Sequence, residues 1–532
     1  MSLLPDATAQ RCALGRQGNG LEADLRSRES LRSVISSPNL LPVEILSYIF
    51  VLHSASLTNV AGASHNPASL ERITITHVCR HWREVASGTA GLWSDILFTT
   101  PRITELMLSR SKTAPLTIAF RQDDSRSLAS LFDIFRNHPH RLYCVEITNI
   151  SNPDILKLLA TSTPVLQSLV LRFQDPVLEE SVELEVPSRL PRGMAPVLKY
   201  LKIFGFCIPQ YDVLPLASTL THLYLNSPNP MHRRPSGVAL LRVLHQSPVL
   251  ETLVLLNYVS AEPYPSSRID NPVECPSLRS LTLGDDARPA LNFLNVVRIQ
   301  EAVLHVAFTN EIDLHKDVPQ FAETIGKARN INARLPLRAL SIYDLRRDRR
   351  DLIVDLSFHE KTETAKHAPG FSLHFLQPLP SNLEDLVFTS LFTLVEERTM
   401  SSIASESEAW AFNQSAWLRF SASQSLKNIV FDCGADPSGF CTLFATGQQL
   451  IINGTTGPVF PSLSTLSLGW PSLQEGSPLR KVIVNALNTR PHHCRVKTLR
   501  VLHSGVECSR PGTAAHDFEI SIPETEVIWV KD

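Results

Sequence analysis

The sequence predicts an α/β protein in which a small all-helical unit is followed by an irregular α/β solenoid with one curved parallel sheet. Two short amphipathic segments with helical periodicity lie between residues 39 and 98. The pattern Leu-x-x-Leu-x-Leu then recurs through residues 99–532, and several copies are separated by segments with the periodicity of a helix. The first observation predicts the helical unit, and the second predicts strands that alternate with helices around a parallel sheet.

The residues before the helical unit carry weaker signals. Residues 1–20 are mixed polar with several glycines, and we expect them to be disordered. Residues 21–38 contain a loose helical pattern that ends at the sequence Ser-Ser-Pro-Asn, so they are expected to form a short lead-in helix and a linker.

The first helix of the unit is expected to start at Leu41 or Pro42. Pro42 lacks an N–H and has its φ angle pre-set, so it suits a first helical turn, and Glu44 places a negative charge near the positive end of the helix dipole. Apolar residues spread around much of this helix. Such a helix must be covered on more than one side. The apolar residues of this helix are Val43, Ile45, Leu46, Ile49, Phe50, Val51 and Leu52.

A second helix is predicted after a polar connection from His53 to Arg72, with Gly88 at its end. One of its faces carries an apolar stripe and the other carries charged residues. Two helices of this size bury too little surface to fold well alone, so they need a partner, a following domain, or both. The stripe consists of Ile75, Val78, Cys79, Trp82, Val85 and Ala86.

The strand pattern of residues 99–532 has a constant internal spacing but irregular intervals between its copies. Helices that return the chain to the next strand are predicted at Pro153–Ala160, Val238–His245 and Leu479–Asn488. The long intervals Asp285–Arg334, Asp344–Pro380 and Thr389–Ser425 are expected to hold extra helices, insertions or degenerate copies. Copies of the pattern start at Leu142, Leu166, Leu198, Leu220, Leu250, Leu278, Leu337, Leu383, Leu426, Leu463 and Val496.

Charge balance, cysteine spacing and the length of apolar segments indicate which kinds of partner and which compartment to expect. Lys and Arg number 50 against 52 Asp and Glu, so electrostatics gives no reason to expect nucleic acid or an anionic membrane, and we predict that neither is a partner. The nine cysteines form no CxxC pair and no zinc-site spacing, which favours a reducing compartment and predicts no bound metal. No segment has the apolar length of a membrane span, so we expect a protein of the cytoplasm, the nucleus, or both.

The ordered set LPVEI, IF, VCRHWR and LW, from Leu41 to Trp93, resembles the F-box of fungal, especially mushroom-type, F-box proteins with a leucine-rich-repeat-like carboxy-terminal half. The resemblance implies that residues 39–98 dock on the Skp adaptor of a cullin-RING ubiquitin ligase, while residues 99–532 hold an unknown protein substrate. The adaptor-facing residues that it implies are Leu41, Pro42, Ile45, Ile49, Val78, Cys79 and Trp82.

A substrate surface can be proposed from the strand pattern. If the strands align in one sheet, the residues between the inward apolar positions face its other side, and the middle of that side carries aromatic residues of the kind that anchor protein partners. The alternative, that these residues pack against the long insertions, stays open. The predicted substrate-binding residues are Tyr200, Phe204, His222, Tyr224 and Tyr343.

The sequence therefore predicts the substrate-receptor subunit of a Skp-cullin-F-box ubiquitin ligase. No phosphate-binding loop, dinucleotide fingerprint, HExxH or GxSxG motif is present, so we expect neither an enzyme nor a cofactor. One alternative is a repeat scaffold that is not part of a ligase and whose F-box-like helices cap the solenoid, which would cover Ile45, Ile49 and Trp82 within the protein. Another is an enzyme with an unfamiliar site, which would show a deep pocket lined by ionisable groups.

Overall fold

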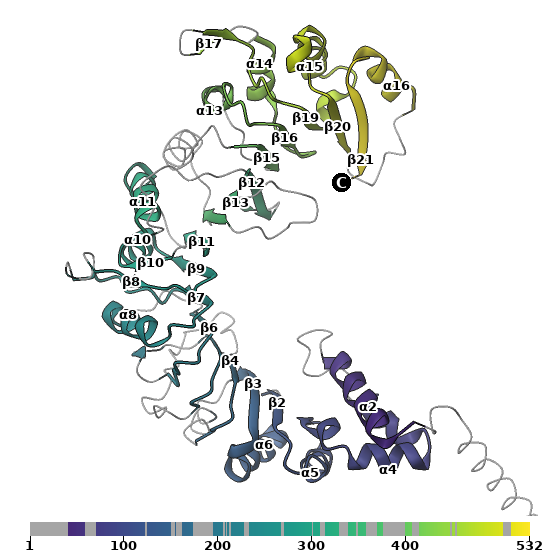
Figure 1. Cartoon of the computed structure of the whole chain (residues 1–532), viewed down its shortest axis with the longest axis vertical. Helices are drawn as coiled ribbons and strands as arrows, with labels where there is room; N and C mark the ends of the chain where they lie inside the picture. The colour runs from purple at the N-terminus through teal and green to yellow at the C-terminus, as the bar shows by residue number, and fades with distance from the viewer. Residues whose placement is uncertain are drawn as a thin grey trace, which may run out of the picture. The chain divides into compact units, whose positions relative to one another are not determined.

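The computed structural model shows a mixed α/β chain with helices at its amino-terminal end and many paired strands (Figure 1). The predicted disordered segment at 1–20 and the lead-in helix at 21–38 lie outside the described residues. The structure describes residues 41–58, 71–122, 125–150, 155, 162–173, 195–205, 208, 210–211, 214–227, 234–265, 267, 271–299, 302–308, 314–328, 339–346, 349–357, 370–375, 400–406, 414–446, 450–452, 455–503 and 512–531.

The chain divides into two compact units. The first unit comprises Met1–Gln174 and Met194–Leu198, and the second comprises Asp175–Gly193 and Lys199–Asp532. The helical region and the first strands belong to the first unit, and the remaining strands belong to the second.

The first unit opens with the predicted helical region. Its first helix starts directly after Pro42, whose carbonyl accepts a hydrogen bond from the Leu46 N–H at 3.0 Å. This helix runs to Thr58, so it extends into the segment that the sequence marks as a polar connection. The elements of this region are α2 (Val43–Thr58), α3 (Glu71–Thr74), η3 (Ile75–His77), α4 (Arg80–Gly88) and η4 (Ala90–Trp93).

The prediction of one continuous second helix is wrong, although the helix ends at Gly88 as predicted. The chain breaks between η3 and α4, because Cys79 adopts an extended conformation with φ −157° and ψ 175°. The Cys79 Sγ accepts a hydrogen bond from the Trp82 N–H at 3.4 Å and so caps α4. The Arg83 Nε donates to the Thr76 carbonyl at 2.8 Å, which holds α4 against the preceding turn.

Four parallel strands complete the first unit, joined in the order β1–β2–β3–β4 among the described residues. Pro101 occupies the first turn of α5, and the Thr100 hydroxyl accepts a hydrogen bond from the Ile103 N–H at 3.3 Å. The elements are β1 (Asp95–Ile96), α5 (Pro101–Arg110), β2 (Leu116–Arg121), α6 (Ser125–Asn137), η5 (Pro139–Arg141), β3 (Leu142–Ile150) and β4 (Ser168–Phe173).

The second unit is built on a large sheet whose described strands pair in the order β5-β6-β7-β9-β11-β14-β13-β12-β15-β16-β19-β20-β21. All of these pairs are parallel except those of β13, which runs antiparallel to β12 and to β14. The strands are β5 (Tyr200–Phe204), β6 (His222–Asn226), β7 (Thr252–Leu256), β9 (Ser280–Asp285), β11 (Val303–Phe308), β12 (Ala339–Arg346), β13 (Arg349–Ser357), β14 (Gly370–Phe375), β15 (Ser402–Glu406), β16 (Asn428–Phe431), β19 (Thr465–Gly469), β20 (Thr498–His503) and β21 (Glu526–Lys531).

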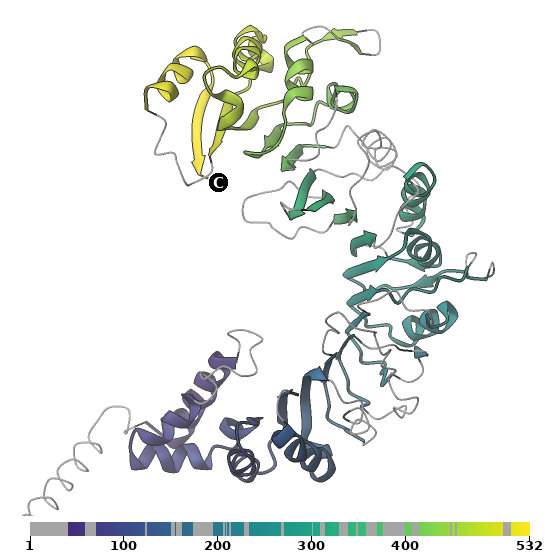
Figure 2. The same cartoon turned by 180° about the vertical axis from the view of Figure 1, so that it is seen from behind.

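Helices lie beside this sheet, and Figures 1 and 2 show α8, α10 and α11 on one side of β7, β9 and β11. Two small strand pairs, β8 (Val273–Glu274) with β10 (Val297–Arg298) and β17 (Leu450–Ile452) with β18 (Thr455–Gly457), lie outside the large sheet. The helices are α8 (Gly237–Gln246), α10 (Ala287–Asn295), α11 (Leu314–Ala328), α13 (Gln414–Phe420), α14 (Ser438–Thr446), η7 (Trp470–Leu473), α15 (Pro478–Thr489), η8 (His492–Cys494) and α16 (Gly512–Ser521).

Residues of the leucine pattern form the core of the sheet. In β5, β6 and β7 every second residue is buried and the residues between them are half-buried, as the alternation predicts. Leu201, Leu223 and Leu253 are each at most 1% exposed. Burial of such aliphatic side chains is the main favourable term that holds the strands to the helices behind them.

The large parallel sheet is thus confirmed, with β13 as a correction to the expectation of parallel strands throughout. Helices α8 and α15 occupy the predicted positions at 238–245 and 479–488. The predicted helix at 153–160 and the copy of the pattern at Leu383 fall mainly or wholly on residues outside the described part. The long intervals hold additional elements, among them α10, β11, β13 and β15. The solenoid arrangement stays a prediction.

Candidate functional site

One face of α2 is apolar and uncovered. Leu46 and Phe50 are each 1% exposed and point into the helical region, together with the buried Ser54. On the opposite side of the helix, four large side chains are spaced at i, i+3, i+4 and i+7, which places them in one stripe. This outer face of α2 consists of Ile45, Tyr48, Ile49 and Leu52, which are 49%, 62%, 42% and 51% exposed.

Val78 adds a further exposed apolar side chain to the helical region. It lies at the break before α4 and is 60% exposed. A continuous helix would have carried Val78 on the buried stripe, but the chain is extended at Cys79, directly after Val78, and Val78 stays exposed. An apolar side chain of this exposure gains free energy when a partner covers it.

The two tryptophans of the helical region are held in different ways. Trp82 is half-buried, and its ring packs on Phe50 of α2 with centroids 5.1 Å apart. Trp93 is 1% exposed, and its Nε1–H donates to the Ala86 carbonyl at 2.7 Å while the Arg110 guanidinium lies 4.5 Å from its ring centroid. Trp82 therefore joins α2 to α4, and Trp93 joins α4 to the following helix α5.

A shallow pocket of about 400 Å³ opens between the amino-terminal half of α2 and α4. On α2 it is lined by Val43 and Ser47, which helical spacing places on the opposite side of the helix from Ile45 and Ile49, and its walls are partly apolar. The Thr89 hydroxyl donates to the Ser47 hydroxyl at 3.0 Å, and both residues line the pocket. The pocket is lined by Val43, Ser47, His81, Glu84, Val85, Gly88 and Thr89.

The residues predicted to face an adaptor fall into two groups. Pro42, Ile45, Ile49 and Val78 are exposed. Leu41, Cys79 and Trp82 are half-buried, and Cys79 and Trp82 have the internal contacts described above. Sequence reasoning did not single out Tyr48 and Leu52 as adaptor-facing, although the spread of apolar residues around α2 already indicated a second covered side.

Four of the five residues predicted to bind a substrate come together on β5 and β6. Tyr200 lies opposite His222 in the strand register, and the Tyr200 ring centroid is 5.6 Å from that of His222 and 5.4 Å from that of Tyr224. Phe204 lies at the other end of β5. Tyr343 lies in β12, beside Ile353 of β13 and Glu406 of β15, and is not brought to the same pair of strands.

Lys202 is a member of this cluster that the sequence analysis did not select. Its Nζ lies 4.8 Å from the Phe204 ring centroid and 5.2 Å from the Tyr224 ring centroid. The faces of aromatic rings attract a nearby cation, so the Phe204 and Tyr224 rings help to fix the position of the Lys202 ammonium group. We refer to Tyr200, Lys202, Phe204, His222 and Tyr224 as the β5–β6 patch.

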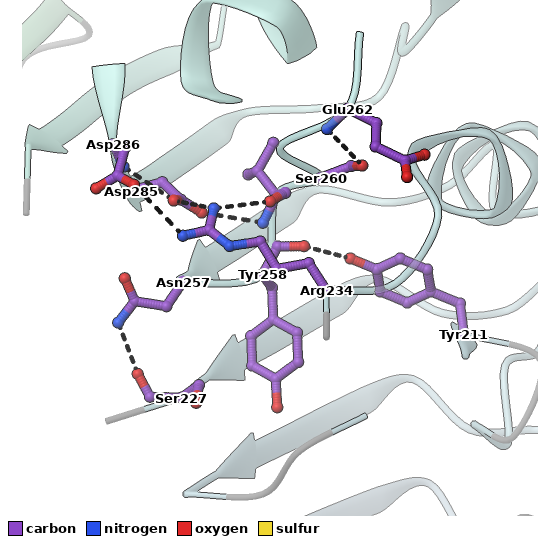
Figure 3. A network of polar contacts seen from close by, with 10 residues as sticks. Tyr211, Ser227, Arg234, Asn257, Tyr258, Ser260, Glu262, Asp285 and Asp286 are labelled. Atoms are coloured by element: carbon purple, nitrogen blue, oxygen red, sulfur yellow. Dashed lines mark hydrogen bonds and ion pairs between the residues drawn. The ribbon is translucent and has the colours of Figure 1, made fainter. Parts of the chain in front are cut away.

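A buried polar network fixes the carboxyl ends of the neighbouring strands (Figure 3). Asp285, at the end of β9, is 0% exposed and forms an ion pair with the Arg234 guanidinium. The same guanidinium donates to the Val259 carbonyl at 3.0 Å, and the Asp285 Oδ2 accepts from the Val259 N–H at 3.0 Å. Arg234 thereby ties the segment before α8 to the ends of β7 and β9.

An adjacent hydrogen bond extends this support toward β6. Asn257 has a positive φ of 62°, which turns the chain at the end of β7, and its Nδ2 donates to the Ser227 carbonyl at 2.8 Å. The Tyr211 hydroxyl donates to the Tyr258 carbonyl at 2.9 Å. These hydrogen bonds join residues at the ends of neighbouring strands to one another, so the network is suited to hold the strands in register.

The described part of the chain offers little for other kinds of chemistry. It brings together no group of three histidine, cysteine, aspartate or glutamate side chains that could bind a metal ion. His492 and His493 of η8 are exposed while Cys494 is buried. None of the described helices combines the length and apolar character that crossing a membrane requires.

Comparison with protein families identifies the helical region. Residues 39–99 match the F-box-like family, so the chain contains an F-box-like domain, in agreement with the resemblance seen in the sequence. F-box domains generally bind Skp adaptors. A search of curated proteins found no matching sequence. The outer face of α2 and Val78 both lie inside the matched domain.

Proposed function

We propose that this chain is a substrate-receptor subunit of a Skp-cullin-F-box ubiquitin ligase, which docks on the Skp adaptor through the outer face of α2 and Val78. The observation that carries the proposal is an uncovered apolar stripe on a helix inside an F-box-like domain. An amphipathic helix with anchors at i, i+3, i+4 and i+7 is the form that inserts into an apolar groove of a partner protein.

The rest of the chain serves to hold a protein substrate in this proposal. The recurrence of one leucine pattern over most of the large sheet supports a leucine-rich-repeat-like solenoid, whose open face presents side chains to a partner. The chain then acts by positioning: it raises the effective concentration of a substrate lysine near the ubiquitin-loaded enzyme, and the transfer chemistry belongs to other subunits. Such a subunit works in the cytoplasm, the nucleus, or both.

The alternative in which the F-box-like helices cap a scaffold predicts that the outer face of α2 is covered, not exposed. If the F-box-like helices served only to cover the end of a scaffold, Ile45 and Ile49 would be covered within the protein. They are 49% and 42% exposed, which counts against this alternative. Trp82 is half-covered by Phe50 and does not discriminate between the two.

The proposal predicts that Ile49→Asp weakens adaptor binding by a factor of about ten to a hundred. The substitution removes apolar area from the interface and buries a carboxylate there, and a loss of about 1.4 kcal/mol already corresponds to a factor of ten. Isothermal titration of the purified chain with a Skp adaptor measures the change.

Leu106→Asp is the matched control. Leu106 is 44% exposed on α5, which is close to the 42% of Ile49, but it lies outside the matched F-box-like domain. We expect this variant to bind the adaptor like the wild type, and circular dichroism should show the same helix content in all three proteins. Equal binding by wild type and Ile49→Asp would exclude the outer face of α2 as the docking surface.

A further inference from the structure

The β5–β6 patch combines a fixed cation with a continuous aromatic surface. Tyr200, His222 and Tyr224 contact one another, with the His222 and Tyr224 rings nearly parallel at 6.5 Å and 12°. The Lys202 ammonium is placed by two aromatic rings from adjacent strands. A lysine held in this way loses less side-chain entropy when an anion binds than a freely rotating one does.

On the side of the sheet that carries the patch, the described strand residues of five adjacent strands include no carboxylate. In β5, β6, β7, β9 and β11 the residues that alternate with the core leucines include one lysine and two histidines, and none of them is aspartate or glutamate. These residues are Tyr200, Lys202, Phe204, His222, Tyr224, Asn226, Thr252, Val254, Leu256, Ser280, Thr282, Gly284, Val303, His305 and Ala307. These strand residues therefore contribute a positive charge and no negative charge to this side, which makes them complementary to a negatively charged partner.

Two apolar residues lie on β7, two strands away from the cation. Val254 lies beside Tyr224 in the strand register, and Leu256 lies beside Asn226. Lys202 and Val254 are two strands apart, which corresponds to about 10 Å, and an extended peptide covers that distance in about three residues. The surface thus fits an acidic side chain and an apolar side chain about three residues apart on one segment.

The chemistry of the cation favours a carboxylate over a phosphate. Arginine is over-represented where a phosphate is recognised by two parallel hydrogen bonds from one planar guanidinium. None of the fifteen alternating positions on these five strands is arginine. A single lysine between aromatic rings matches one carboxylate flanked by apolar groups.

We propose that the β5–β6 patch binds an acidic, unphosphorylated segment of a partner protein, with a carboxylate at Lys202 and an apolar side chain over Val254 and Leu256. This inference rests on the proposed receptor function, because it names the class of substrate segment that the large sheet would hold. It assigns the recognition to a surface that is separate from the outer face of α2.

Selection from a displayed library of random dodecapeptides on the immobilised full chain tests the inference. We expect enrichment of peptides with glutamate or aspartate about three residues from a large apolar residue. An enriched peptide should lose affinity by a factor of about ten or more when its acidic residues become glutamine or asparagine, and by a similar factor on Lys202→Met or Tyr224→Ala protein.

Lys427→Met serves as the matched control, because Lys427 is an exposed lysine of the same unit before β16. This variant should bind the peptide like the wild type. Failure to enrich any motif, enrichment of neutral or basic peptides, or equal loss in both lysine variants would overturn the inference, and so would a peptide that binds only after phosphorylation of a serine.

Adaptor titration of the same proteins separates this inference from the receptor function. Lys202→Met should bind the Skp adaptor like the wild type, and Ile49→Asp should bind the selected peptide like the wild type. Loss of peptide binding to a chain that still binds the adaptor refutes only the patch, whereas loss of adaptor binding by the wild type refutes the receptor function.

Discussion

The conformation of Cys79 affects which apolar side chains of the helical region are exposed to solvent. By capping α4 through its Sγ, it ends the turn before the helix and leaves Val78 60% exposed. Sulfur is a weaker acceptor than the hydroxyl or carboxylate oxygens that usually cap helices. The resemblance to other F-boxes implied that Cys79 faces the adaptor, whereas its contact with the Trp82 N–H gives it a role inside the domain.

Substitution of Cys79 separates these two roles. Cys79→Ser should keep the cap and leave adaptor affinity within a factor of about two, because serine is a favourable N-cap residue. Cys79→Ala should lower the free energy of opening of α4 by about 0.5–1 kcal/mol. Hydrogen exchange of the α4 amides in the full chain measures the opening. A large loss of adaptor affinity in Cys79→Ser, with normal exchange of α4, would show instead that the sulfur contacts the adaptor.

Trp82 also acts inside the domain, and this changes which substitution tests docking best. The resemblance to other F-boxes implied that Trp82 faces the adaptor, which would make Trp82→Ala a test of docking. In the structure the same change removes the ring that packs on Phe50 and loosens α4 from α2. A substitution of Ile49 should disturb the fold less, because Ile49 is 42% exposed. Its buried neighbours Leu46 and Phe50 hold α2 in place.

At the scale of elements, the alternating leucine pattern predicted most strands of the sheet, because every second residue of a strand in β5 to β7 is buried. Strands β11 and β15 were not identified individually, since they lack the leucine phrase. The antiparallel strand β13 was also missed, because periodicity does not reveal strand direction. The break at Cys79 was missed because the apolar stripe from Ile75 to Ala86 continues at helical spacing across it.

The sequence predicted part of each candidate site, namely which residues share a face of α2 or a side of the sheet. Helical spacing placed Ile45 and Ile49 on α2, but only the fold shows which side of that helix stays uncovered. Strand alternation placed Tyr200, His222 and Tyr224 on one side of the sheet. The position of Lys202 between two aromatic rings depends on the register of β5 against β6, which the sequence does not reveal.

The buried ion pair between Arg234 and Asp285 holds the ends of β7 and β9 together, and its loss should lower the free energy of unfolding substantially. Burial raises the pKa of the Asp285 carboxyl above its ordinary value, although the Arg234 guanidinium opposes this rise. Because the folded state then binds the proton more tightly than the unfolded state, Asp285 makes folding less favourable as the pH rises from its ordinary pKa through its raised pKa.

Arg234→Met should therefore lower the free energy of unfolding of this region by about 3–5 kcal/mol at neutral pH, where it leaves a buried carboxylate without its cation. The deficit should shrink as the pH falls toward the raised pKa of Asp285, since a neutral carboxyl needs no counter-charge. Urea unfolding between about pH 5 and 7 tests this expectation. Arg242→Met, on the exposed side of α8, is the control and should change stability by about 0.5 kcal/mol or less. A deficit that grew at low pH would contradict this account.

At the scale of the whole molecule, the chain carries two surfaces of different character. The first is an apolar stripe on α2 in the first unit, and the second is an aromatic and cationic patch on β5 and β6 in the second unit. Because the two surfaces share no residues and lie in separate compact units, adaptor binding and segment binding should be additive in their free energies. A receptor that joins an adaptor to different substrates needs this independence.

Site-directed photo-crosslinking tests whether the outer face of α2 contacts the adaptor. The full chain is prepared with benzoylphenylalanine in place of Ile49 or, as a control, in place of Leu106, mixed with a Skp adaptor and irradiated. We expect a crosslink to the adaptor from position 49 and none from position 106, because only the first lies on the outer face of α2. A crosslink from position 106 alone, or an adaptor complex with no crosslink from position 49, would contradict docking through this face.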